Sequence, residues 1–387
     1  MSIRNTMGSL VHRAAVRSLP LKDRIILESY PLFTDNTKAV YDEMIRRGLN
    51  RRYELVWVTA QPEAVFPHVT ASNVRFMRTG GGVAQRARLR YTMERAKAVI
   101  VGNVMLPKYN PRQCYINLAH GAPLKDCSRH YNLPDYADEF LSLSSYLRPY
   151  DALNMNCPVA KVKTFGFPRN DVLLSPRHDL HGIFPDRRFT KVIYWMPTYR
   201  QNCSGLALSD IAMPIIYDEA IAARISDCAR QAGVLVVVKP HFAQDVARLK
   251  VMDLENLFFI NDAYLAAHGI MNYELLRDCD ALLTDYSSVY YDYLLVDRPI
   301  GLCWDDIEQY RRQEGFIVDP GLVLSGGEKI YTPEDLCGFI RRVAAGQDVS
   351  ATARRANRDL VHQYADDQSS RRVVDHIEQL LTAVGRQ

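Results

Sequence analysis

The chain has 387 residues, which is enough for two domains that each bury an apolar core. Its formal net charge is only +4, and it contains no zinc-finger spacing and no long basic run. We therefore do not expect a nucleic-acid-binding protein.

Eight cysteines are scattered along the chain, and no two of them form a CxxC pair. The N-terminal residues lack the apolar centre of a secretory signal, and no stretch approaches the ~20 apolar residues of a membrane span. The sequence therefore predicts reduced thiols and a cytoplasmic location.

Residues 1–22 combine apolar residues at helical spacing with four basic residues, Arg4, Arg13, Arg17 and Lys22. A basic amphipathic helix of this kind binds an anionic membrane surface. The same pattern is also typical of a first helix packed on the protein. Both interpretations remain open at this stage.

Short apolar runs then alternate with helical stretches. In the first half, the strand-like runs are residues 24–28, 55–59, 74–77, 98–101, 114–118, 140–143 and 162–165, and helices are predicted at 37–47 and 83–97. A polar segment with two prolines, residues 175–188, is the predicted linker.

The second half repeats the alternation. Its strand-like runs are residues 191–195, 234–238, 257–260, 281–284 and 300–303, with helices at 216–231 and over 349–384, interrupted near Asp366. The pattern predicts an α/β protein with two doubly wound parallel sheets, in domains 1–178 and 188–387. Ligands bind such sheets beyond the carboxyl ends of the strands.

The most informative strand end is Leu282-Leu-Thr-Asp-Tyr-Ser-Ser288, where two hydroxyl residues open an amphipathic helix. Unpaired N–H groups and the helix dipole favour an anion there. A plain helix cap by Asp285 or Ser287 is the alternative. We expect a diphosphate site, because other polar strand ends accompany this one.

Three of those strand ends carry basic groups. Lys239 and His241 leave one buried strand together, and Arg200 follows another. From the first half, His120 lies directly beyond a strand beside Gly121, with Asp126 as a candidate orienting partner. Surface salt bridges and packed histidines are the structural alternatives.

Six motifs in chain order resemble those of the CDP-glycerol glycerophosphotransferase family, the enzymes that prime or polymerise teichoic acids and related capsule polymers. They are Glu28-Ser-Tyr-Pro-Leu-Phe-Thr-Asp-Asn36, His120-Gly-Ala-Pro-Leu-Lys125, Gly166-Phe-Pro-Arg-Asn-Asp171, Tyr194 to Arg200, Lys239-Pro-His241 and Thr284-Asp-Tyr-Ser-Ser-Val-Tyr-Tyr-Asp292. Ala122 departs from the family pattern, where threonine is usual.

The resemblance implies a GT-B architecture and transfer of glycerol phosphate from CDP-glycerol to a hydroxyl of a polyprenyl-diphosphate-linked glycan or growing polymer, with release of CMP. Within this reaction we assign His120 as the general base, because it comes from the half expected to face the acceptor, and His241 as a donor to the diphosphate. The expected substrate-binding residues are Gly121, Lys125, Arg169, Asn170, Thr198, Arg200, Lys239, Thr284, Asp285, Ser287, Ser288 and Asp292.

The sequence contains no Walker A motif and no metal-ligand cluster of histidines and cysteines, so we expect neither a metal nor a cofactor. The lipid-linked acceptor implies that the enzyme acts as a peripheral protein at the inner face of the cell membrane. CDP-ribitol as donor, a glycosyltransferase using a nucleotide sugar, and a catalytically silent binding module remain alternatives. The sequence separates neither primase from polymerase nor teichoic acid from capsule, and it gives no oligomeric state.

Overall fold

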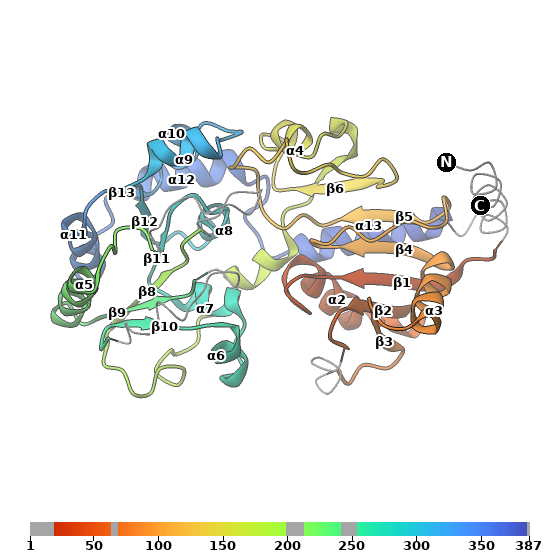
Figure 1. Cartoon of the computed structure of the whole chain (residues 1–387), viewed down its shortest axis with the longest axis horizontal. Coiled ribbons are helices and arrows are strands. Elements are labelled where there is room, and N and C mark those ends of the chain that lie inside the picture. The colour runs from red at the N-terminus through yellow and green to blue at the C-terminus, as the bar shows by residue number, and fades with distance from the viewer. Residues whose placement is uncertain (1–18, 63–68, 199–212, 241–253, 385–387) are drawn as a thin grey trace.

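The computed structural model describes residues 19–62, 69–198, 213–240 and 254–384. Within these residues the strands form two parallel sheets that lie side by side (Figure 1). The first sheet has the order β3 (Val74–Arg78), β2 (Glu54–Thr59), β1 (Lys22–Glu28), β4 (Ala96–Val101), β5 (Cys114–Asn117), β6 (Glu139–Ser142) and β7 (Val162–Thr164).

The second sheet has the same winding. Its order is β10 (Leu257–Phe259), β9 (Val234–Val238), β8 (Lys191–Trp195), β11 (Ala281–Thr284), β12 (Ile300–Cys303) and β13 (Glu328–Ile330). In each sheet the strand order reverses beside the first strand, between β1 and β4 and between β8 and β11. A crevice opens beyond the strand ends at such a reversal, which is where this architecture binds ligands. The predicted fold class is confirmed.

Helices cover the faces of both sheets. Those of the first half are α2 (Asp35–Arg46), α3 (Val83–Glu94) and α4 (Arg148–Asn154), with the 3-10 helices η1 (Leu49–Arg51), η4 (Val159–Lys161) and η5 (Pro168–Leu174). Those that follow β8 are α5 (Glu219–Gln231), α6 (Asp262–Ala267), α7 (Asn272–Asp278), α8 (Val289–Tyr293), α9 (Ile307–Gln313), α10 (Pro320–Val323), α11 (Pro333–Ala344), α12 (Ala351–Val361) and α13 (Ser369–Val384).

The second sheet packs against an apolar core on each of its two faces. Val192 and Tyr194 of β8 pack into an apolar core that continues into the first half, whereas Ile193 and Trp195 pack into a separate core beneath α5 and α11. Side chains of a strand point to opposite faces in turn, so a continuous apolar run fills both cores.

Helix α13 crosses from the second half to the first sheet, beside β4 and β5 (Figure 1). Its first turn is capped by Asp171 of η5, whose two carboxylate oxygens accept from the Ser369 and Ser370 amides at 2.9 and 2.7 Å. Arg47, at the end of α2, pairs with Asp375 and Glu378 on α13. The sequence analysis assigned this helix to the predicted second domain, residues 188–387. The boundaries of both domains, 1–178 and 188–387, stay a prediction.

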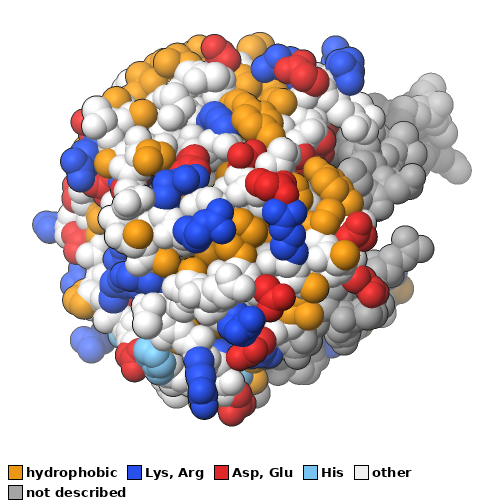
Figure 2. Space-filling model, turned by 90° about the vertical axis from the view of Figure 1, so that its left-hand side faces the viewer, with side chains coloured by type: hydrophobic (Ala, Val, Ile, Leu, Met, Phe, Trp, Pro, Cys, Tyr) orange, Lys and Arg blue, Asp and Glu red, His pale blue; other side chains and the backbone are white. Residues whose placement is uncertain are grey.

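Two further features bear on contact with a membrane or with nucleic acid, namely the N-terminal segment and the surface charge. Residues 1–18, most of the predicted amphipathic helix, lie outside the described residues. Within the part of the chain that the structure describes, no helix is both long enough and apolar enough to cross a bilayer. On the face drawn in Figure 2, basic and acidic side chains are interspersed rather than separated by sign.

Candidate active site

A cavity of about 1260 Å³ lies between the two halves and is lined by residues from both. Its wall includes the segments that follow β1, β4 and β5 of the first sheet and those that follow β8, β9 and β11 of the second. Eight predicted site residues lie on this wall: His120, Gly121, Lys125, Arg169, Thr198, Lys239, Ser287 and Ser288.

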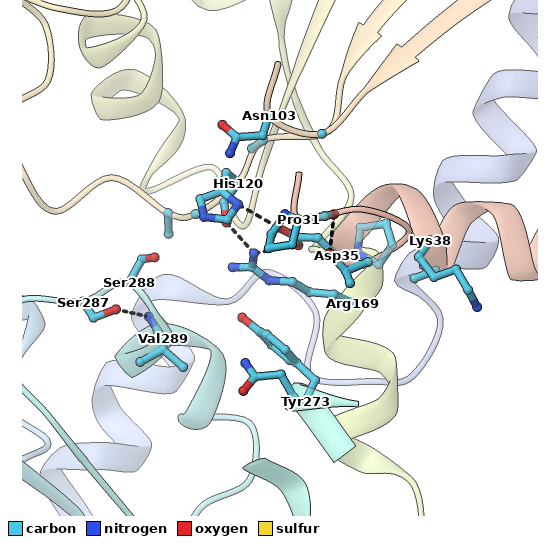
Figure 3. A pocket seen from close by; sticks show the side chains of 18 of the residues that line it. Pro31, Asp35, Lys38, Asn103, His120, Arg169, Tyr273, Ser287, Ser288 and Val289 are labelled. Carbon is cyan, nitrogen blue, oxygen red and sulfur yellow. Dashed lines mark hydrogen bonds and ion pairs between the residues drawn. The ribbon is translucent and has the colours of Figure 1, made fainter. Parts of the chain in front are cut away.

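His120 stands on a turn that directly follows β5. Its side chain is about half exposed, at 52%, and its Nδ1 lies 2.8 Å from the Asp35 carboxylate (Figure 3). Asp126, the orienting partner considered from the sequence, instead accepts from the amide and hydroxyl of Ser128 at 3.1 and 2.6 Å. The partner of His120 is therefore an aspartate 85 residues earlier in the chain.

Asp35 begins α2 and also holds Arg169 of η5. Its second carboxylate oxygen accepts from Arg169 Nη1 at 2.7 Å, and the same guanidinium donates to the backbone carbonyl of His120. Arg169 is buried, and its guanidinium carbon lies 5.2 Å from the ring centroid of Phe167 and 5.0 Å from that of Tyr273. Figure 3 shows Arg169 directly beneath His120, with Tyr273 on its far side.

Asp292 of α8 closes this network from the second half. It is fully buried and accepts from Arg169 Nη2 at 2.8 Å, Asn170 Nδ2 at 2.9 Å and the Tyr273 hydroxyl at 2.6 Å. Neither Asp292 nor Asn170 lines the cavity. Their polar groups connect η5 to α7 and α8 across the junction of the two halves.

The network sets the charge state of its carboxylates. Burial alone would raise the pKa of Asp35, but the Arg169 guanidinium and His120 hold that pKa well below its ordinary value. Burial opposes the charge of Arg169, yet Asp292 and Asp35 raise its pKa. This buried arginine is therefore a fixed cation beneath His120.

Glu28, at the end of β1, supports the opposite edge of the cavity. Burial raises its pKa to about 7, although its carboxylate accepts from the backbone amides of Gly102, Asn103 and Val104 at 3.0–3.3 Å. Gly102 and Asn103 line the cavity. The carboxyl group thus holds the loop after β4 in place without lining the cavity itself.

On the second half, two buried residues position Thr198. Asp285 accepts from the Thr198 amide at 3.0 Å and from its hydroxyl, while Thr284 donates to the carbonyl of Met196 at 2.8 Å. Asp285 and Thr284 are fully buried and do not line the cavity. Asp285 joins the turn after β11 to the segment after β8.

Ser287 and Ser288 follow this turn and face His120 across the cavity (Figure 3). Among the described residues, neither serine amide donates to another group of the chain. The helix they precede, α8, has only five residues, so its dipole contributes less than the sequence suggested. Gly121 approaches closely here, since a Cβ on it would lie 3.1 Å from Ser288 Cβ and closer still to Ser288 Oγ.

The two lysines predicted from the sequence, Lys239 and Lys125, also line the cavity. Lys239, at the end of β9, lies 3.0 Å from the exposed carboxylate of Asp262. Lys125 lies over the ring of Tyr310, and its backbone bridges to Phe316 of the second half. Arg200 and His241 lie outside the described residues, so their positions stay predictions.

Asp35 is the site residue that sequence reasoning missed. Its segment, Glu28 to Asn36, was singled out among the motifs, and Asp35 follows β1 of the first sheet. No spacing rule connects it to His120, because the two segments meet only through the β1–β4–β5 order. Within the described residues no cluster of histidine, cysteine and carboxylate side chains is arranged to hold a metal ion.

Comparison with solved structures identifies the fold. The wall teichoic acid polymerase TagF superposes with a TM-score of 0.74 at 19% identity, over 99% of both chains. UDP-GlcNAc 2-epimerase from Neisseria meningitidis superposes less well, with a TM-score of 0.54 at 12% identity, over 92% of this chain and 99% of that one. Proteins of different chemistry share this fold, so the fold alone does not decide the function.

Comparison of sequences is more specific. The chain is 26% identical over 365 residues to the teichoic acid glycerol-phosphate transferase of Staphylococcus aureus, covering 82% of this chain and 85% of that protein. It is 26% identical over 352 residues to the teichoic acid poly(glycerol phosphate) polymerase of Bacillus spizizenii, covering 81% and 83%. A ribitol-phosphate polymerase of Staphylococcus aureus is 23% identical over 310 residues, which cover 73% of this chain and 50% of that protein.

The family model for CDP-Glycerol:Poly(glycerophosphate) glycerophosphotransferase matches residues 11–379. The match spans both sheets and the cavity between them, and it confirms the resemblance drawn from the six motifs. The chain therefore belongs to the CDP-glycerol:poly(glycerophosphate) glycerophosphotransferase family and is a transferase.

Proposed function

We propose that this enzyme transfers glycerol phosphate from CDP-glycerol to a hydroxyl of a polyprenyl-diphosphate-linked glycan or a growing polymer, and releases CMP. One observation carries the proposal. A histidine from one half and a pair of serines from the other, His120 with Ser287 and Ser288, face the same cavity in a chain of this family. A base and an anion-binding surface on opposite walls suit phosphoryl transfer to a hydroxyl.

In the proposed reaction, His120 takes the proton of the acceptor hydroxyl as that oxygen attacks the β-phosphorus of the donor. The new oxygen–phosphorus bond forms while the bridge to the α-phosphate breaks, and the electron pair of that bond leaves with CMP. Lys125 and Gly121 line the same cavity and would contact the substrate there. Gly121 allows the two walls to approach at Ser288.

The donor diphosphate would lie against Thr198, Lys239, Ser287 and Ser288, which offer hydroxyl and ammonium donors. For Arg200 and His241 we retain the roles suggested by the sequence, a charge clamp and a donor to the diphosphate. No metal or cofactor is part of this scheme.

Four of the residues expected to bind substrate have a different proposed role. Thr284, Asp285, Asn170 and Asp292 are buried behind the wall, and their polar groups contact the chain. We propose that they act indirectly, by holding Thr198, Arg169 and the turn after β11 in place.

Ribitol-phosphate transfer from CDP-ribitol is the second candidate. It is favoured by the match to ribitol-phosphate polymerases, at 23% identity over 310 residues, and to a ribitol-phosphate primase, at 22% over 232 residues. The two donors differ only in the length of the polyol, so a single cavity can hold either.

The proposed acceptor is anchored in lipid, which would bring the enzyme to the inner face of the cell membrane as a peripheral protein. We propose capsule-type polymers as a second product class beside teichoic acids. Nucleic acid is not a proposed partner, because the net charge is only +4 and the face in Figure 2 mixes both signs.

The test is an assay of CMP release with a synthetic lipid-diphosphate disaccharide and, in separate reactions, CDP-glycerol, CDP-ribitol and UDP-sugars. Acceptor-dependent CMP release from CDP-glycerol, with one or more glycerol phosphates added to the acceptor by mass spectrometry, is expected. His120→Ala should abolish it without loss of the folded state. Transfer from a UDP-sugar alone, or full turnover by His120→Ala, would overturn the proposal.

A further inference from the structure

Among the described residues, His120 has a hydrogen-bonding partner on one side of its ring only, at Nδ1. We infer that Asp35 is the positioning residue for His120: its carboxylate accepts from Nδ1–H and thereby leaves Nε2 unprotonated toward the cavity. The inference rests on the proposed function of His120 as the base. Asp35 itself does not need to touch the substrate.

The first argument is that the carboxylate of Asp35 cannot turn away. One oxygen lies 2.8 Å from His120 Nδ1, and the other accepts from Arg169 Nη1 at 2.7 Å and from the Asn36 amide at 2.8 Å. The Asp35 side chain is only 9% exposed, so little of it is open to water. Both ends of the carboxylate are therefore fixed.

The second argument is electrostatic. Arg169 is anchored by Asp292 from the second half and keeps Asp35 ionised. An ionised carboxylate is only an acceptor, so the imidazole nitrogen beside it must carry the proton. In the neutral ring the proton then resides on Nδ1, and Nε2 keeps the lone pair that a general base requires.

The third argument comes from the backbone. Ala119, the residue before His120, has a φ of 58°, which is unfavourable for a residue with a Cβ. Asn36 holds this turn, because its Nδ2 donates to the carbonyls of Leu118 and Ala119 at 2.9 and 3.0 Å. Such a conformation persists only where the surrounding structure imposes it. Asp35 and Asn36 thus fix both the ring of His120 and the turn that presents it.

The direct test is the tautomer of His120 in the unaltered protein. Nitrogen-15 spectra of histidine-labelled enzyme would be recorded at alkaline pH, and the His120 signals would be assigned by their loss in His120→Gln. We expect the proton on Nδ1. A proton on Nε2 in the folded wild-type enzyme would overturn the inference, and this measurement requires no change at Asp35.

The kinetic test compares Asp35→Asn with Asp126→Asn. Asparagine has an NH2 group in place of one carboxylate oxygen of aspartate, and this group donates a hydrogen bond and cannot accept one. We therefore expect the tautomer of His120 to change and kcat to fall by about 10²–10⁴-fold. The donor KM should change little. Asp126→Asn keeps an oxygen for the Ser128 amide and serves as the matched control, with unchanged kcat and tautomer.

The outcomes separate the two hypotheses. If His120→Gln retains turnover, the proposed role of His120 fails, yet the tautomer still reports whether Asp35 positions the ring. If His120→Gln is inactive while folded Asp35→Asn keeps both kcat and tautomer, the inference about Asp35 fails alone. Should Asp35→Asn not fold, the wild-type spectrum decides.

Discussion

At the scale of single residues, Ser287 and Ser288 are the test of the proposed donor site. Their hydroxyls line the cavity and precede a helix of only five residues, so the side chains matter more than a helix dipole. Hydrogen bonds to charged groups contribute about 1.5–3 kcal/mol each. The double variant Ser287→Ala with Ser288→Ala is therefore expected to lower kcat/KM for the donor by at least about tenfold.

Steady-state kinetics with varied donor concentration would measure this loss. A rise in KM alone would indicate that the serines hold the ground state, and a fall in kcat that they act in the transition state. Ser325→Ala is the control, since its hydroxyl donates to Leu322 and does not line the cavity. An unchanged kcat/KM in the double variant would contradict the donor site.

Glu28 makes a prediction about pH and stability. Its pKa is raised by burial to about 7, so the folded state keeps the proton over a range in which the unfolded state releases it. The stability that this group contributes is present below the unfolded pKa and is lost as pH rises through about 7, with a total of about 3 kcal/mol.

Glu28→Gln removes this titration and keeps an oxygen for the three amides of the loop after β4. We expect similar stability of variant and wild type near pH 4.5, and a more stable variant at pH 8. Urea unfolding at both pH values measures the difference, in which all other titrating groups cancel. Equal stability differences at the two pH values would show that folding does not raise the pKa of Glu28.

Sequence reasoning reached some of these residues and not others, for a physical reason. His120, Ser287 and Ser288 each follow a strand directly, and strand ends are readable from a local pattern. Asp35 meets His120 only through the strand order of the folded sheet. Asp292 and Asp285 stand beside the right segment, but no local pattern tells a buried bridging carboxylate from one that meets a ligand.

At the scale of elements, the strands were the most predictable part. The ranges 191–195 and 234–238 coincide with β8 and β9, because fully buried strands are continuous apolar runs. The strand β13 was missed, since its three residues, Glu328, Lys329 and Ile330, include only one apolar side chain. The helix predicted to follow Ser288 is shorter than its apolar pattern implied.

The prediction at the scale of elements concerns Arg169 of the 3-10 helix η5. Arg169 bridges Asp35 and Asp292 with separate nitrogens, and a lysine in its place has a single ammonium group. Arg169→Lys therefore leaves one buried carboxylate without its guanidinium partner, and we expect a loss of about 3–5 kcal/mol in stability.

The urea midpoint measures this loss, and CMP release should fall as well. Arg230→Lys, at an exposed pair with Asp227, is the matched control and should change stability by less than about 1 kcal/mol. If Arg169→Lys were as stable as that control, the buried network would not be what joins η5 to α8.

At the scale of the whole molecule, two doubly wound sheets enclose one cavity, and the acceptor proposed for that cavity belongs to a membrane. Residues 1–18 lie outside the described residues, but their sequence is basic and amphipathic. Deleting residues 1–20 is expected to reduce co-sedimentation with anionic vesicles severalfold, and added salt should reduce binding of the intact chain.

Activity on a short, water-soluble acceptor should survive the same deletion, because the cavity is built from later residues. Equal vesicle binding with and without residues 1–20 would leave the exposed basic side chains of α3 as the alternative contact. They include Arg86, Arg88 and Arg90, and replacing these three by glutamine would then test it.

Helix α13 also determines when the first half of the chain can complete its folding during translation. The first sheet is translated early, but the helix that packs beside β4 and β5 and is capped by Asp171 emerges roughly 200 residues later, a delay of about 10–40 s at ordinary synthesis rates. Until then the nascent first half has an uncovered apolar surface that is available to chaperones. Ribosome-bound chains stopped before residue 369 are expected to be cleaved readily by protease in the first half, and chains extended past residue 384 to resist.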